Sequence, residues 1–114
     1  MSRENLPNRR TSFTESITTT DNQTIAATIG VDQNLRPREV FLTGAKEGSH
    51  MSFLLDDASV IISIALQHNI TARELSHSVS PNRTSILAAA LELIIHYEEN
   101  GPDVPRPTTQ FRVV

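Results

Sequence analysis

Two stretches in the first half of the chain, residues 23–31 and 38–43, place apolar side chains at every second position, which is the pattern of a half-buried strand. In a third stretch, residues 12–20, Phe13, Glu15, Ile17 and Thr19 share one face and β-branched residues are frequent, which also favours a strand. The segments between them are short, and short connections favour antiparallel pairing between neighbours. We therefore expect a three-stranded antiparallel meander. The side chains expected on the repeating faces are Phe13, Glu15, Ile17, Thr19, Ile25, Ala27, Ile29, Val31, Val40 and Leu42.

The pattern then changes to the period of a helix, and residues 51–68 form its most apolar segment. At about 100° per residue, the polar side chains of this segment fall on a single narrow stripe. Apolar side chains occupy most of the remaining circumference. A helix apolar over so wide an arc must be covered on more than one side, so we predict that it is central to the fold. The stripe consists of Ser52, Asp56, Ser59, Ser63 and Gln67.

Asp57 interrupts the apolar arc of this helix, because it projects between Phe53 and Ile61. A buried carboxylate is costly unless a cation or an N–H group pairs with it. On this interpretation Asp57 is a buried charge. The alternative is that Asp57 lies at the edge of the packed region and reaches water. The candidate partners are Arg9, Arg10, Arg38 and Lys46.

Two further helices are expected after this segment. Thr71 and Glu74 have the spacing of a capping box, which predicts a short helix at residues 72–78. Residues 84–100 place apolar side chains on one face of a longer amphipathic helix, which Gly101 and Pro102 end. The expected fold class is α+β, in the order β-β-β-α-α-α, with the helices packed on one face of the sheet.

The length of 114 residues leaves room for one domain and no second core. We place that domain at residues 12–101. A polar arm with several arginines precedes it at residues 1–11. A tail with several prolines follows at residues 102–114 and is expected to be extended or disordered, with residues 110–114 able to add an edge strand.

Composition narrows the chemistry of the chain. A formal charge of −3 is not the signature of a nucleic-acid-binding or membrane-binding protein. No stretch approaches the ~20 apolar residues of a membrane span, so we expect a cytoplasmic protein. Cysteine is absent, which excludes disulfides, thiolate zinc sites and dithiol redox chemistry. The four histidines, at positions 50, 68, 77 and 96, lack the spacing of metal ligands, and we expect neither a metal nor a cofactor.

The turn at residues 44–49 is the best candidate for a ligand site. It joins a predicted strand to the apolar helix, and its glycines would let the backbone approach an anion. The first turn of the helix offers free N–H groups, and nearby basic side chains add positive charge. The spacing is not that of a Walker A loop, and an ordinary connection with a serine cap explains the same residues. The candidate anion-binding residues are Gly44, Lys46, Gly48 and Ser49, with Arg9 and Arg10 from the arm.

Two segments resemble a known family. The run Glu39-Val40-Phe41-Leu42-Thr43-Gly44-Ala45-Lys46-Glu47-Gly48-Ser49, followed by Ser63-Ile64-Ala65-Leu66-Gln67-His68-Asn69-Ile70, is similar to the TSCPD domain. That domain lies near the C-terminus of adenosylcobalamin-dependent (class II) ribonucleotide reductases and also forms small bacterial and phage proteins. The arm segment 6–10 and the helical segment 86–94 extend the resemblance over most of residues 5–95.

The resemblance implies a relation to ribonucleotide reduction without the catalytic machinery. These reductases need cysteines for the thiyl radical and its re-reduction, and this chain has none. It also lacks the barrel that houses the radical chemistry. Asn69 stands where the family usually has glycine after the histidine that ends the helix.

Three functional hypotheses follow, and the first is the preferred one. The chain is a non-catalytic accessory or protein-interaction module, acting as a homodimer or on a reductase-related partner through the polar stripe or the basic arm. Alternatively, it binds a nucleotide or another anion at residues 44–49. As a second alternative, it is a reductase-associated subunit that needs a separate catalytic chain. No catalytic residue is assigned in any of the three.

Overall fold

The computed structural model describes residues 11–19, 24–79, 86–101 and 112–113. Strand β1 (Ser12–Thr19) pairs antiparallel with β2 (Thr24–Val31), which pairs antiparallel with β3 (Pro37–Thr43). The predicted three-stranded meander is therefore confirmed. The two-residue strand β4 (Arg112–Val113) joins β1 in parallel, which gives the strand order β3-β2-β1-β4. The rest of the predicted tail and the predicted arm up to residue 10 lie outside the described residues.

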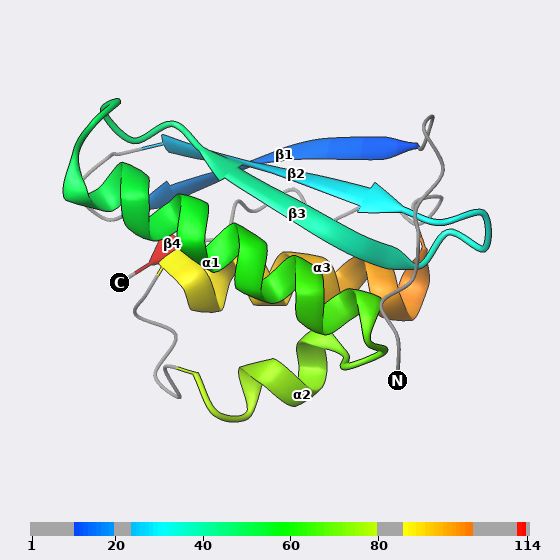
Figure 1. Ribbon diagram of the computed structural model, residues 1–114. Coiled ribbons are helices and arrows are strands. Elements are labelled where there is room, and N and C mark those ends of the chain that lie inside the picture. The colour runs from blue at the N-terminus through cyan, green and yellow to red at the C-terminus, as the bar shows by residue number, and fades with distance from the viewer. Residues whose placement is uncertain (1–10, 20–23, 80–85, 102–111, 114) are drawn as a thin grey trace.

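Three helices follow the meander, as predicted, and all lie on the same side of the sheet (Figure 1). Helix α1 (His50–Gln67) runs alongside β3, and α3 (Ile86–Asn100) lies behind it beneath the strands. The short helix α2 (Ala72–Ser76) is the element farthest from the sheet in this view. The α+β class and the order β-β-β-α-α-α are confirmed, with β4 as an addition at the end.

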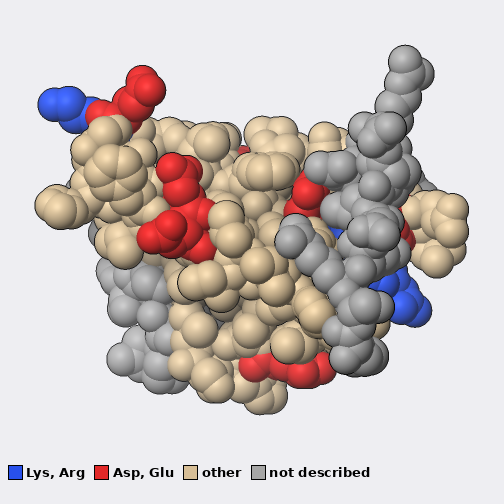
Figure 2. All heavy atoms as spheres, in the orientation of Figure 1, with Lys and Arg blue, Asp and Glu red and all other residues tan. Residues whose placement is uncertain are grey.

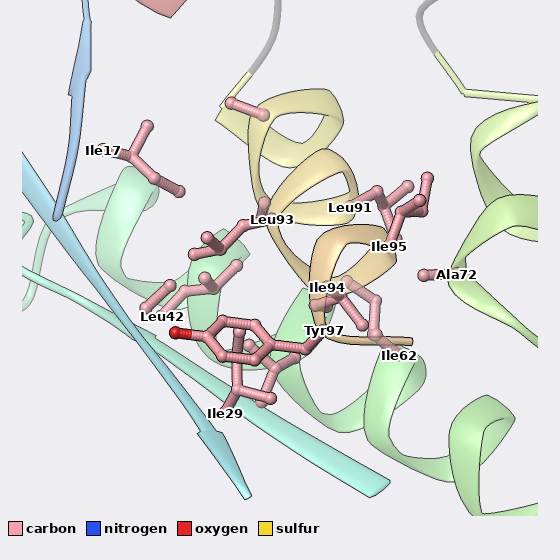
Figure 3. Packing of buried hydrophobic residues seen from close by; sticks show 14 of the residues in the cluster. Ile17, Ile29, Leu42, Ile62, Ala72, Leu91, Leu93, Ile94, Ile95 and Tyr97 are labelled. Atoms are coloured by element: carbon pink, nitrogen blue, oxygen red, sulfur yellow. The ribbon is translucent and has the colours of Figure 1, made fainter. Parts of the chain in front are cut away.

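The core is aliphatic, as expected for a chain with 4% aromatic residues. Helix α3 is buried on two sides, since Leu93 and Tyr97 point towards the strands while Leu91 and Ile95 point towards α2 (Figure 3). Most side chains predicted to face inward from the strands are buried, Phe13 and Glu15 are partly buried, and the side chain of Thr19 is not described. Helix α1 contributes fewer buried side chains. The buried members from the strands and α1 are Ile17, Ile25, Ala27, Ile29, Val31, Val40, Leu42, Leu55, Ile62 and Leu66.

Arg38, at the start of β3, forms a buried ion pair with Asp32 and hydrogen bonds to the end of α1. The Nε of Arg38 donates to Oδ2 of Asp32 at 3.0 Å. Its Nη1 donates to the carbonyl of Leu66 at 2.9 Å and to the side-chain oxygen of Asn69 at 2.7 Å. Arg38 had been a candidate partner of Asp57, and the structure gives it to Asp32 instead. One side chain thus joins the β2–β3 connection to the C-terminus of α1.

Burial by itself would raise the pKa of Asp32. The backbone N–H groups of Arg36 and Asn34 and the Arg38 guanidinium outweigh that effect and hold the pKa below its usual value. Because the folded state favours the ionised form, this carboxylate stabilises the fold above the pKa it has in the unfolded chain. The stabilisation is lost as the pH falls through its folded pKa.

Candidate functional site

The polar stripe of α1 faces the backbone of β3. Ser59, Ser63 and Gln67 are all buried there. The N–H groups of Leu42 and Val40 donate to the hydroxyls of Ser59 and Ser63, each at 3.0 Å. The Nε2 of Gln67 donates to the carbonyl of Arg38 at 3.1 Å. These contacts satisfy backbone groups on the outer edge of the sheet that a neighbouring strand would otherwise bind.

The match between helix and strand is geometric. Four residues of an α-helix rise by about 6.0 Å, and two residues of a β-strand advance by roughly 6.6–6.8 Å. A polar side chain at every fourth position of α1 therefore meets the outward groups of every second residue of β3 when the two run antiparallel. This part of the stripe, which was considered above as a contact for a homodimer or another partner, therefore makes hydrogen bonds within the fold.

The opposite side of α1 is apolar and exposed. Phe53 is 55% exposed, Leu54 is 62% exposed and Ile61 is 67% exposed. The expectation that α1 is covered on more than one side is wrong for the described chain, because the helix packs through its polar stripe and only a narrow apolar strip. Large contiguous apolar patches on a protein surface mark interaction sites more often than isolated apolar residues do. We call this surface the α1 outer face, and it consists of Phe53, Leu54, Asp57, Val60, Ile61 and Ile64.

Asp57 lies on this outer face and is exposed, as is the adjacent Asp56. Of the two alternatives left open for Asp57, the structure shows the one in which the carboxylate reaches water. Lys46, a candidate partner, is in the turn before the helix. Among the described residues, neither Asp56 nor Asp57 has an ion-pair partner.

A groove of about 370 Å³ lies between α1 and the outer side of β3. Phe41 forms part of one wall and Val60 part of the other, and both side chains are exposed. Because Val60 belongs to the α1 outer face, the groove and the face are continuous. In Figure 2 this side of the molecule is mostly apolar or uncharged, with carboxylates within it and Lys or Arg only towards the edges. The remaining lining residues are Glu39, Val40, Leu42, Thr43, Asp56, Ser59, Ser63 and Gln67.

The turn at residues 44–49 has the serine cap that the sequence predicted. The Ser52 N–H donates to the hydroxyl of Ser49 at 3.1 Å, so this donor of the first helical turn is already occupied. The Ser49 hydroxyl in turn donates to the Lys46 carbonyl at 2.5 Å. Lys46 and Gly48 are exposed beside it. The structure thus brings four of the candidate anion-binding residues into one turn.

Gly44 has a structural reason of its own. Its φ is +117°, a conformation that L side chains rarely adopt, and an added Cβ would lie 2.8 Å from the Thr24 carbonyl oxygen of β2. The glycine is therefore needed to bring β3 out of the sheet past its neighbour. The other two candidates for an anion, Arg9 and Arg10, lie outside the described residues.

A second hollow, of about 340 Å³, lies between the β2–β3 connection and the start of α2. Most of its polar groups already have partners in the fold. Arg38 binds three groups, and Oε2 of Glu98 accepts the Ala72 N–H at 2.7 Å. Burial raises the pKa of Glu98 above its usual value, even though that N–H opposes the shift. The polar groups of this hollow thus belong to contacts that join β3 to the end of α1 and α2 to α3.

Metal and membrane sites find no support among the described residues. No group of three or more His, Asp or Glu side chains there could hold a metal ion. Within the same ranges, no helix is long and apolar enough to cross a membrane.

Three features of the structure were missed from the sequence. The role of the α1 stripe had a signal, because Ser59, Ser63 and Gln67 repeat every four residues on one side of an apolar helix. The exposure of the outer face had none, since its residues are as apolar as those of a buried helix. The Asp32–Arg38 pair was likewise not distinguishable from other charged pairs.

Comparison with known proteins places the chain in a family. The model of the TSCPD domain matches residues 2–105. Over 81 residues the chain is 31% identical to a vitamin B12-dependent ribonucleotide reductase of Rhodopirellula baltica, and the match covers 71% of this chain. It spans 8% of the length of that reductase. No solved structure matches the chain significantly. The family resemblance read from the strand, the turn and α1 is thus confirmed, and the chain belongs to the TSCPD domain family.

Proposed function

We propose that this chain is a non-catalytic interaction module that docks on a ribonucleotide reductase or a reductase-related protein through the α1 outer face. The observation that carries the proposal is the exposure of large apolar side chains along one side of an otherwise well-packed helix. Covering exposed apolar surface of this kind with a partner lowers the free energy of the complex by about 25 cal/mol per Å² buried. The relation to the reductase supports the choice of partner, because the matched relative carries a similar segment within one long chain.

The absence of cysteine supports a non-catalytic role. Re-reduction of a reductase site requires thiols, and the full sequence has none. Any part of these 114 residues in nucleotide reduction therefore depends on thiols supplied from outside them. This is the sense in which the chain would be an accessory subunit.

The nucleotide-binding alternative receives less support from the turn at residues 44–49. Ser49 already caps the helix, and Glu47 is exposed close to Lys46. No buried polar side chain of the described turn is directed at a ligand position. The docking function is favoured because five large apolar side chains are exposed on the α1 outer face, namely Phe53, Leu54, Val60, Ile61 and Ile64.

The test measures binding of the purified chain to a vitamin B12-dependent ribonucleotide reductase from the same organism. Ile61→Asp should weaken binding at least about tenfold, because a covered isoleucine contributes ~1.5–3 kcal/mol and ~1.4 kcal/mol is tenfold in affinity. Interferometry or calorimetry gives the Kd. Ile61 is 67% exposed, so the variant should keep the wild-type melting temperature.

The matched control is Leu35→Asp, which changes another exposed branched aliphatic side chain, one that lies in the β2–β3 connection and outside the α1 outer face. Its binding should equal that of the wild type. Equal binding by wild type and Ile61→Asp would refute docking through this face. Absence of any binding to the reductase would refute the choice of partner.

A further inference from the structure

Resting on the proposed docking function, we infer that the α1 outer face accepts an amphipathic helix of the partner that places a lysine or arginine opposite Asp57. The occupant is thus defined by an apolar stripe interrupted by one basic side chain.

The shape suits a helix. The exposed apolar residues of α1 recur at the spacing of one helical face, from Phe53 through Val60 to Ile64. The groove between α1 and β3 runs beside this ridge, with Phe41 on its far wall. Ridge and groove together offer anchoring positions for side chains at i, i+3 or i+4, and i+7 of a bound helix, the usual arrangement when a helix docks in a groove.

The charge on this surface has one sign. Asp57 lies between Phe53 and Ile61, and Asp56 lines the adjoining groove. The residues that line the groove include no lysine or arginine, and the outer face has none either. Helix α1 itself has no lysine or arginine, and its one histidine, His50, is at its N-terminus. Any partner that covers the apolar residues must also cover Asp57, and a carboxylate without a counter-ion is costly once water is removed.

A second copy of this chain does not meet that requirement. In a twofold helix pair, the centre of the face contacts the same centre on the other copy. Asp57 lies near the middle of α1, so the two carboxylates would approach each other in a contact without a basic side chain. Like charges brought together with loss of water oppose association. A partner with a basic side chain at this point removes both difficulties.

The experiment selects helix-forming peptides from a display library on the immobilised full chain, in parallel with its Asp57→Lys variant. On the wild type, enriched peptides should share an apolar stripe and a lysine or arginine at one fixed position of that stripe. On Asp57→Lys, the same position should change to aspartate or glutamate. The best wild-type peptide should bind Asp57→Lys at least about tenfold more weakly.

Controls separate this inference from the docking function itself. Glu74→Lys makes the same change in charge on an exposed residue of α2 and should leave peptide binding unchanged. Ile61→Asp should remove binding of the selected peptides. Apolar peptides without a basic preference, still lost in Ile61→Asp, would overturn the inference and leave the docking face in place.

Two other results would refute the basic helix as the occupant, and the first of them would also refute the docking function. If the selected peptides bind Ile61→Asp as well as the wild type, both the inference and the docking function fail. If sedimentation equilibrium shows a dimer that Ile61→Asp disrupts and Asp57→Asn strengthens, the occupant is a second copy and the basic helix is refuted.

Discussion

Arg38→Ala should destabilise the fold by about 3–5 kcal/mol, the range for removing one partner from a buried ion pair. The variant leaves the Asp32 carboxylate without its guanidinium and removes the Arg38 donor from the Asn69 side chain. It also removes one of the donors to the Leu66 carbonyl, which still accepts the backbone N–H of Asn69. These groups belong to the β2–β3 connection and to the end of α1. Loss of the Arg38 side chain should therefore weaken the attachment of β3 to both segments. Urea denaturation followed by circular dichroism measures the change in the free energy of unfolding.

The pH dependence of this effect identifies its cause. The pKa of Asp32 is held below its usual value, so its stabilising contribution is present at neutral pH and is lost as the pH falls through the folded pKa. The difference between wild type and Arg38→Ala should therefore narrow as the pH falls below about 4, where aspartates become protonated. The control is Arg36→Ala, since Arg36 is exposed. A constant difference at every pH, or equal losses for the two variants, would contradict the ion-pair explanation.

The double variant Ser59→Ala/Ser63→Ala should cost about 2–6 kcal/mol. Each serine accepts a hydrogen bond from a β3 N–H, and leaving such a buried donor unsatisfied costs ~1–3 kcal/mol. An exposed strand edge also invites pairing between molecules, so the variant should aggregate at lower concentration. Chemical denaturation and light scattering measure the two effects.

Ser52→Ala is the matched control for that variant. Ser52 lies on the same stripe and is only partly buried, and its backbone N–H, not its side chain, makes the capping contact. Its replacement should change stability by no more than about 0.5 kcal/mol. If the double variant is no less stable than Ser52→Ala, the serines do not cap the edge of the sheet.

The sequence was most informative where a local pattern determines the structure. The alternation in residues 24–31 fixed the inward face of β2, and the Thr71–Glu74 capping box predicted α2, whose N-terminus the Thr71 side chain does cap. The turn before α1 likewise showed its serine cap in advance. These features depend on residues that are close together in the sequence, so they can be predicted from it.

The surroundings of α1 could not be predicted in the same way. Its period identified a helix and two kinds of face, but hydrophobicity alone implied that the apolar face is buried. In the structure the polar side of α1 is buried instead, because Ser59, Ser63 and Gln67 hydrogen-bond to backbone groups on the outer edge of β3. This contact leaves Ile61 on the exposed side of the helix. The deciding factor is a long-range pairing between strand and helix. The four-residue repeat of Ser59, Ser63 and Gln67 marks the polar side of α1, but it does not identify the edge of β3 as the partner of that side.

The exposure of the α1 outer face changes the role expected for Asp57. As a buried charge it would have required a partner within the chain, and the arginine suited to that role binds Asp32. On an exposed apolar face it becomes a feature that a partner must match. Helix α1 thus has two separate tasks, since one side completes the sheet and the other side is available for binding.

The most direct measurement of the docking claim is site-specific photo-crosslinking in cells of the source organism. A photoreactive residue replaces Ile61 on the α1 outer face and, in separate samples, Leu35 in the β2–β3 connection and Ser16 on the open side of the sheet, all of which are exposed. We predict a discrete adduct with a partner protein at position 61 and none at positions 35 or 16. Adducts at position 35 or 16, with none at position 61, would contradict the docking function proposed for α1.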